Sequence, residues 1–134
     1  MHGLHLTADL HGCPPDLPVM IDPAALQALC EAAVAEAGLG AVATLFHRFE
    51  PHPALGDAAP AGITGVVLLA ESHLAVHTWP EQGGVTLDVH VCHLGRDNRA
   101  AARALMARLC AAFEPARSHH QALERGRPGA DTLA

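Results

Sequence analysis

The chain has 134 residues, of which 50% are hydrophobic and 16% charged, so it can bury the core of one compact domain and does not have the composition of a disordered chain. Its eight basic and fourteen acidic residues give a formal net charge of −6, which argues against nucleic acid or an anionic membrane surface as a partner. All eight basic residues are Arg, and without Lys the chain cannot hold pyridoxal phosphate as a Schiff base.

Local signals predict seven elements along the chain. One is a helix that begins at Pro23, because Asp22 can cap it, Pro suits its first turn and Gly38 suits the position just past its end. The last expected strand alternates between apolar and polar residues, and Asp97 can cap the helix that follows it. The expected elements are strands at 2–9, 41–49, 63–70, 72–79 and 83–92, and helices at 23–37 and about 98–113.

The order of these elements predicts an α+β fold. Consecutive strands with short connections favour an antiparallel β-sheet with the two helices packed on one face. The Pro- and Gly-rich residues 50–62 predict a loop, and residues 117–134 are expected to add a short element and then fray. Residues 1–134 are therefore expected to form a single domain.

The N-terminal residues and the cysteines indicate the compartment. There is no signal-peptide pattern and no apolar run of the length that spans a membrane, so we expect a cytoplasmic protein without a membrane partner. Cys13, Cys30, Cys92 and Cys110 form no CxxC pair, which argues against a zinc ribbon or a redox motif. Free thiols are expected.

The polar residues Glu71, Ser72 and His73 stand between two apolar strands, where burying them is costly without a purpose. His73 and His77 are four residues apart and share one face of a strand, as His90 and Cys92 do on the next strand. Three interpretations are open at this point. The polar residues are idle strand ends; or His73, His77, His90 and Cys92 or His93 bind a metal; or His77 activates Ser72 or Cys92 as a nucleophile.

One run of residues resembles a known family. The sequence AESHLAVHTWPE at 70–81 is similar to AESHISIHTWPE of the prokaryotic S-adenosylmethionine decarboxylase proenzymes, which depend on a pyruvoyl group. FHRF at 46–49 matches the family's FHxF, GLHLTADLHGC at 3–13 resembles its GRHLLAEFYGC, and LDVHVC at 87–92 resembles its VDxFTC. The resemblance covers about residues 3–114 in collinear order.

The resemblance implies that the chain cuts itself. The hydroxyl of Ser72 would attack the carbonyl of Glu71 to form an ester, and elimination would leave a β chain of residues 1–71 and an α chain of residues 72–134. The new N-terminus would carry a pyruvoyl group made from Ser72. His77 would accept the proton removed during the elimination, and Thr64 would support this processing through its hydroxyl.

The resemblance also implies roles in decarboxylation. The pyruvoyl group would form a Schiff base with the amine of S-adenosylmethionine, and Cys92 would donate the proton that replaces the carboxylate. Glu81, Phe46 and Phe49 would bind the substrate. The product, decarboxylated S-adenosylmethionine, is the aminopropyl donor for spermidine and other polyamines. No metal is implied.

The family's sites lie between two subunits. Ser72 and Cys92 would come from one protomer, and His77, Thr64 and Glu81 from the other. The implied homodimer stacks two sheets between two layers of helices, an αββα-type sandwich.

The sequence departs from the family pattern at four positions near the motifs: Leu4 replaces a basic residue, Thr64 a serine, His90 an aromatic residue, and His93 a glycine. The residues expected to process the chain are all present. Arginine or ornithine is therefore kept as an alternative substrate of the same pyruvoyl chemistry, and a non-processing regulatory or metal-binding homologue as a third interpretation.

Overall fold

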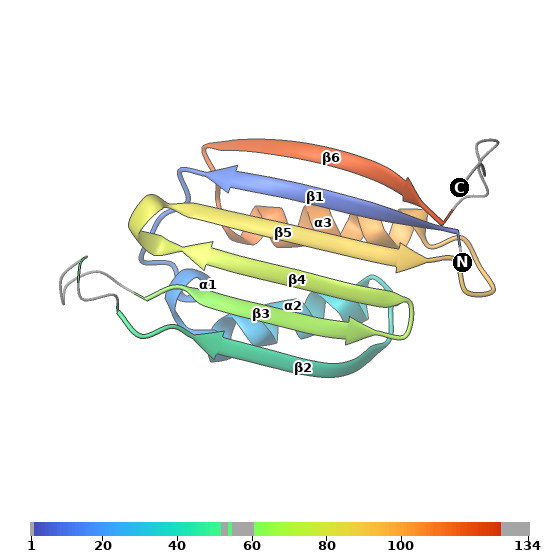
Figure 1. The fold of residues 1–134 in the computed structure, drawn as a ribbon, viewed down its shortest axis with the longest axis horizontal. Coiled ribbons are helices and arrows are strands. Elements are labelled where there is room, and N and C mark those ends of the chain that lie inside the picture. Colours follow the sequence, from blue (N-terminus) through green and yellow to red (C-terminus); the bar gives the residue numbers. More distant parts are fainter. Residues whose placement is uncertain (1, 52–53, 55–60, 127–134) are drawn as a thin grey trace.

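The computed structural model describes residues 2–51, 54 and 61–126, which fold as a six-stranded antiparallel sheet with helices on one face (Figure 1). The strands lie in the order β2-β3-β4-β5-β1-β6. They are β1 (Gly3–His11), β2 (Ala41–Arg48), β3 (Ile63–Leu69), β4 (Ser72–Trp79), β5 (Gly84–Cys92) and β6 (Arg117–Arg125), and the helices are α1 (Pro18–Ile21), α2 (Pro23–Glu36) and α3 (Arg99–Ala112).

The predicted α+β class is confirmed, and each predicted strand and helix is present within two residues of its expected bounds. At α2 the local signals explain the start and the end. The Asp22 side chain accepts a hydrogen bond from the backbone N–H of Ala24 at 3.0 Å, and Gly38 has a positive φ of 78° just beyond the last turn. Most of the predicted loop at 50–62 lies outside the described residues.

Three details differ from the sequence-based prediction. α3 begins after Asn98, and Asp97 accepts the backbone N–H of Arg99 through its side chain instead of occupying the cap position itself. α1 is an additional short helix. The expected short element after residue 116 is the nine-residue strand β6, which pairs with β1 along its length. Every residue of β6 is exposed, so it has no apolar alternation for a sequence pattern to detect.

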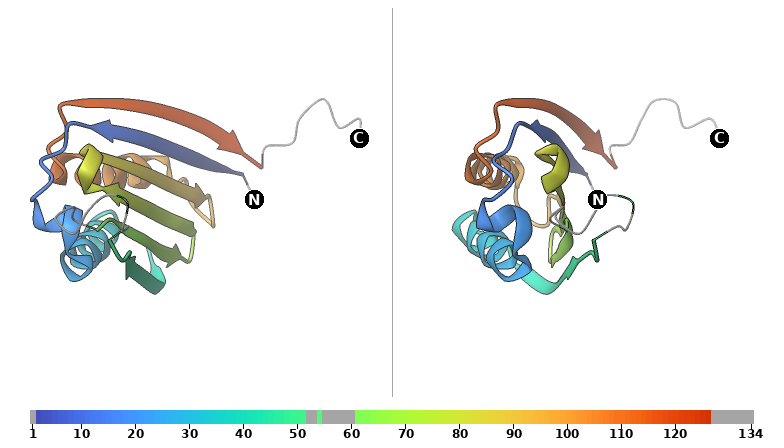
Figure 2. Two further views of the ribbon diagram at one scale, coloured as in Figure 1. Left: turned by 60° about the vertical axis from the view of Figure 1, so that its left-hand side comes forward. Right: turned by 90° about the vertical axis from the view of Figure 1, so that its left-hand side faces the viewer.

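The two faces of the sheet differ (Figure 2). The helices cover one face, where alternate residues of each central strand are buried: Leu74 and Val76 on β4, and Val85, Leu87, Val89 and Val91 on β5. The other residues of these strands lie on the opposite face, which no described helix covers and which we call the open face. The predicted alternation of β5 is therefore confirmed, and its polar residues lie on the open face.

Candidate active site

The turn between β3 and β4 places Glu71 and Ser72 at one end of the sheet. Ser72 has a φ of 154°, a conformation that residues other than glycine rarely adopt. A backbone in such a region stores about 1–3 kcal/mol of strain. The strained torsion is that of Ser72, and the peptide bond between Glu71 and Ser72 is the predicted cleavage site.

The carbonyl group of Glu71 is held from the neighbouring strand. The backbone N–H of Cys92 donates a hydrogen bond to the Glu71 carbonyl oxygen at 2.7 Å. This bond draws electron density from the carbonyl carbon and would stabilise negative charge on the oxygen if a nucleophile attacked. The Glu71 side chain is fixed separately, because its Oε1 accepts the backbone N–H of Gly40 at 3.1 Å.

The hydroxyl of Ser72 lies between two imidazoles. Its Oγ is 3.3 Å from Nδ1 of His73 and 3.3 Å from Nδ1 of His90. The register pairs His73 with His90, and His90 with His5 on β1, and the three rings form a compact cluster on the open face, in which the centroids of His5 and His73 are 6.5 Å apart. The rings of His5 and His90 are stacked with centroids 5.2 Å apart, and the ring of His73 meets that of His90 edge-on at 5.4 Å.

Polar contacts from Asp88 and Arg125 fix the His5 ring of this cluster. Nε2 of His5 is 2.9 Å from Oδ1 of Asp88, and Nη1 of Arg125 is 3.2 Å from Nδ1 of His5. Because a guanidinium can only donate, Nδ1 of His5 accepts its hydrogen bond and Nε2 donates to the carboxylate of Asp88. Burial lowers the pKa of His90 below its ordinary value, and the neighbouring His5, His73 and Arg125 lower it further.

A pocket of about 400 Å³ opens beside the predicted cleavage site. Its size falls within the range of small-molecule sites. The pocket is lined by Ala70, Glu71, Ser72, His90, Cys92, Arg125 and Gly126. The Ser72 hydroxyl and the Cys92 thiol therefore border the same space, with one basic side chain from β6.

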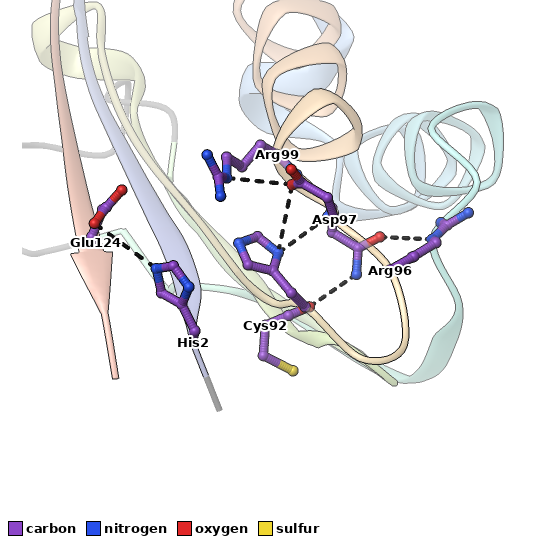
Figure 3. Close-up of polar contacts among 8 residues, drawn as sticks. His2, Cys92, Arg96, Asp97, Arg99 and Glu124 are labelled. Carbon is purple, nitrogen blue, oxygen red and sulfur yellow. Dashed lines mark hydrogen bonds and ion pairs between the residues drawn. The ribbon is translucent and has the colours of Figure 1, made fainter. Parts of the chain in front are cut away.

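The segment after Cys92 anchors the end of β5 to the helix layer (Figure 3). The side chain of Asn98 donates to the Cys92 carbonyl oxygen at 2.9 Å, and its backbone N–H donates to Nδ1 of His93 at 3.1 Å. Arg96 donates to Oδ1 of Asn98 at 2.8 Å and to the carbonyl oxygen of Gly38 at 2.7 Å. The thiol of Cys92 points away from this network (Figure 3).

A second group of predicted site residues lies toward the opposite end of β4. Oγ1 of Thr64 is 2.7 Å from Nδ1 of His77 across the β3–β4 pair. Glu81 is exposed in the 3₁₀ turn that follows β4. Ser72 and His77 are five residues apart on one strand, so their Cα atoms are roughly 16 Å apart. Within one chain the structure therefore does not bring His77 to the predicted cleavage site.

The two predicted substrate-binding aromatic residues lie in different surroundings. Phe46 packs partly buried against the core, and its ring lies over Gly65, where an added Cβ would come within 2.2 Å of ring carbons. Phe49 follows β2 and is 50% exposed. Neither residue lines the pocket beside Ser72.

The metal-binding interpretation gains no support, because no cluster of three or more His, Cys, Asp or Glu suited to a metal ion occurs among the described residues. No helix in residues 2–51, 54 and 61–126 is long and apolar enough to cross a membrane.

The sequence-based prediction missed Arg125, His5 and Asn98 as parts of the site. Arg125 and His5 reach it through strand pairing. No motif in the sequence marks Arg125, and His5 lies in the run GLHLTADLHGC, whose resemblance to the family gave it no role.

Comparison with known proteins identifies similar chains. A family model described as S-adenosylmethionine decarboxylase matches residues 4–126. The S-adenosylmethionine decarboxylase proenzyme of Aquifex aeolicus is 40% identical over 124 residues, which are 92% of this chain and 81% of the relative. The proenzyme of the same name from Archaeoglobus fulgidus is 34% identical over 92% of this chain and 97% of its own length.

A solved structure has the same fold. The crystal structure of the adenosylmethionine decarboxylase from Aquifex aeolicus superposes with a TM-score of 0.79 at 33% sequence identity. The superposition covers 98% of this chain and 97% of that chain. The α+β architecture is thus shared over the whole domain.

Proposed function

Because the chain belongs to the S-adenosylmethionine decarboxylase family, we propose that it cuts itself between Glu71 and Ser72 and then decarboxylates S-adenosylmethionine. The observation that carries this proposal is the geometry of the 71–72 bond. A strained serine places its hydroxyl between two imidazoles, and the carbonyl before it accepts a hydrogen bond from Cys92. The product would be the aminopropyl donor of polyamine synthesis.

The residues present fit a pyruvoyl group made from Ser72. Cleavage would give a β chain of residues 1–71 and an α chain of residues 72–134 with this group at its N-terminus. The group supplies a carbonyl that accepts the electrons left behind when the substrate's carboxylate departs as carbon dioxide. It would lie at the wall of the pocket that the Cys92 thiol also borders, and Cys92 would donate a proton to the substrate carbon.

The proposed site needs two protomers. His77 lies roughly 16 Å from Ser72 of its own chain, so the proton acceptor of the processing reaction would be the His77 of a second chain. The open face suits such an interface because it carries large apolar side chains without a cover: Leu45 is 70%, Leu68 47% and Trp79 39% exposed. A homodimer that stacks two open faces would bury these side chains and would bring Thr64, His77 and Glu81 of one chain toward Ser72 of the other.

Intact-mass spectrometry of the purified protein tests the cleavage. Two chains that meet at residues 71 and 72, with a pyruvoyl mass on the second, are expected. The Ser72→Ala variant should stay whole because it lacks the nucleophile, whereas Ser118→Ala, on the exposed strand β6, should cleave normally. A wild-type chain that remains whole on incubation would contradict the proposal and favour a non-processing homologue.

Arginine or ornithine is the second candidate substrate. His90 gives the pocket a polar wall where the family pattern has an aromatic residue, and Arg125 adds a cation that can pair with a carboxylate. Carbon dioxide release from the three substrates, measured on the same cleaved preparation, separates the candidates. The strongest release is expected from S-adenosylmethionine, and a preference for arginine or ornithine would reject the substrate while retaining the mechanism.

A further inference from the structure

Within the proposed self-cleavage, on which this inference rests, we infer that His90 is the base that takes the proton from Ser72 Oγ, while His73 donates a hydrogen bond to the same oxygen. The family pattern has an aromatic residue at the position of His90. The role proposed for His90 is therefore specific to this chain and is not a feature of the family pattern. The inference concerns the first chemical step, whereas the role proposed for His77 concerns the later elimination.

The contacts of Ser72 require two different roles for its neighbours. A hydroxyl has one proton to donate, and Oγ of Ser72 lies 3.3 Å from two imidazole Nδ1 atoms. It can donate to one of them and must accept from the other if both contacts are hydrogen bonds. One histidine is therefore the acceptor that can take the proton, and the other holds the oxygen in place.

The surroundings of His90 favour the acceptor role. Its ring contacts both other rings of the cluster, stacked on His5 and edge-on to His73. Burial lowers the pKa of His90, and a second proton would in addition place a cation near the imidazoles of His5 and His73 and the guanidinium of Arg125. His90 is therefore neutral near pH 7 and keeps a lone pair for the Ser72 proton.

The step balances without any co-reactant. Oγ forms a bond to the carbonyl carbon of Glu71 as its proton passes to Nδ1 of His90, and the N–H of Cys92 stabilises the charge on the carbonyl oxygen. The bond from that carbon to the Ser72 nitrogen then breaks, and His90 returns the proton to the nitrogen. The amide has become an ester with a free amine, and His90 is again neutral.

Cleavage kinetics of the full-length chain test this assignment. The chain is made by cell-free synthesis, and the uncleaved fraction is followed by intact mass. His90→Phe keeps a ring of similar size against His5 but has no nitrogen, and His90→Ala leaves room for added imidazole. Both should cleave about 100-fold more slowly than wild type or more, the usual contribution of a general base. The matched control, His119→Ala on exposed β6, should cleave at the wild-type rate.

Two readouts separate a base from a structural support. Added imidazole should accelerate His90→Ala but not His90→Phe. The wild-type rate should fall as the pH drops through the lowered pKa of His90. The charged and titratable groups around His90 are His73 on β4, His5 on β1, Asp88 and Cys92 on β5, and Arg125 on β6. The His90→Phe profile should lack this inflection.

Three results would count against the assignment. Normal cleavage of His90→Phe would overturn it, and so would a folded His90→Ala protein that imidazole does not accelerate, or an inflection that survives in His90→Phe. Circular dichroism establishes that each variant is folded. A wild-type chain that never cleaves would refute the proposed function itself, so the two failures are distinguishable.

Discussion

At the scale of single residues, the contact between Thr64 and His77 determines which nitrogen of His77 can act. The Thr64 hydroxyl is 2.7 Å from Nδ1. If Nδ1–H donates to this oxygen, the lone pair of Nε2 is free, which is the tautomer a proton acceptor needs. The serine of the family pattern could make the same contact, so the threonine in this chain keeps a hydroxyl at this position.

Thr64→Val tests this contact because it keeps the shape of the side chain and removes the oxygen. Losing one hydrogen bond of about 1 kcal/mol should slow cleavage roughly fivefold. Thr64→Ser should cleave close to the wild-type rate. The measurement is the uncleaved fraction over time by intact mass, and equal rates for Thr64→Val and wild type would show that the hydroxyl does not hold the tautomer.

Cys92 contributes two different groups to the site, and these can be separated. Its backbone N–H contacts the Glu71 carbonyl, and its thiol borders the pocket. In Cys92→Ala the N–H remains and the thiol is lost, so cleavage should proceed within about tenfold of wild type while carbon dioxide release falls at least about 100-fold. Equal loss of both activities would show that the thiol also acts in processing.

The residues of the motif could be named from the sequence, but their contacts could not. The bond from Cys92 to Glu71 joins the end of β5 to the turn before β4, and it depends on the register of β4 with β5. The same holds for the contact of Ser72 with His90. Alternation predicts which side chains share a face of one strand, and only the pairing of strands decides which of them meet.

At the scale of elements, α2 was predictable and β6 was not. α2 has a capping Asp22, a proline in its first turn and a glycine past its end, so local chemistry marks both of its limits. β6 is an exposed edge strand that is held by backbone pairing with β1, and its sequence RSHHQALER has no apolar face. Arg125 reaches the pocket only because this strand pairs with β1.

We expect the buried thiol of Cys30 on α2 to make the stability of the protein depend on pH. Burial, assisted by the charge of Glu31, raises the pKa of Cys30 from 9.0 to about 12. Above about pH 9 the unfolded chain loses this proton while the folded chain keeps it. The stabilisation is complete below the unfolded pKa and is lost as the pH rises, with a slope of about 1.4 kcal/mol per pH unit up to the folded pKa.

Urea unfolding at about pH 8 and about pH 10 measures this effect. Cys30→Ala is the control, since it lacks the titrating thiol and should lose less stability between the two pH values than wild type. Cys13 and Cys110, whose pKa values burial also raises, remain in both proteins and cancel in the comparison. Equal losses in the two proteins would show that Cys30 ionises in the folded state.

At the scale of the whole molecule, the chemistry is divided between the two ends of the sheet. One end holds the predicted cleavage site with Cys92 and the pocket, and the other holds Thr64 and His77. Both residues lie on β4, and no change of rotamer brings His77 to Ser72 across roughly 16 Å of strand. A single protomer contains every residue of the proposed reaction but not in one place.

Two defective chains should therefore restore one another. His77→Ala keeps a cleavable Ser72 but offers no proton acceptor to its partner, and Ser72→Ala keeps His77 but cannot be cut. Each homodimer should stay whole. In a mixed dimer the Ser72 of the His77→Ala chain faces the intact His77 of the other chain, so that one chain alone should cleave. Co-expression with two different affinity tags, tandem purification and intact mass identify which chain is cut. A purified mixed dimer that stays whole would place the proton acceptor on the same chain as Ser72 and would contradict the shared site.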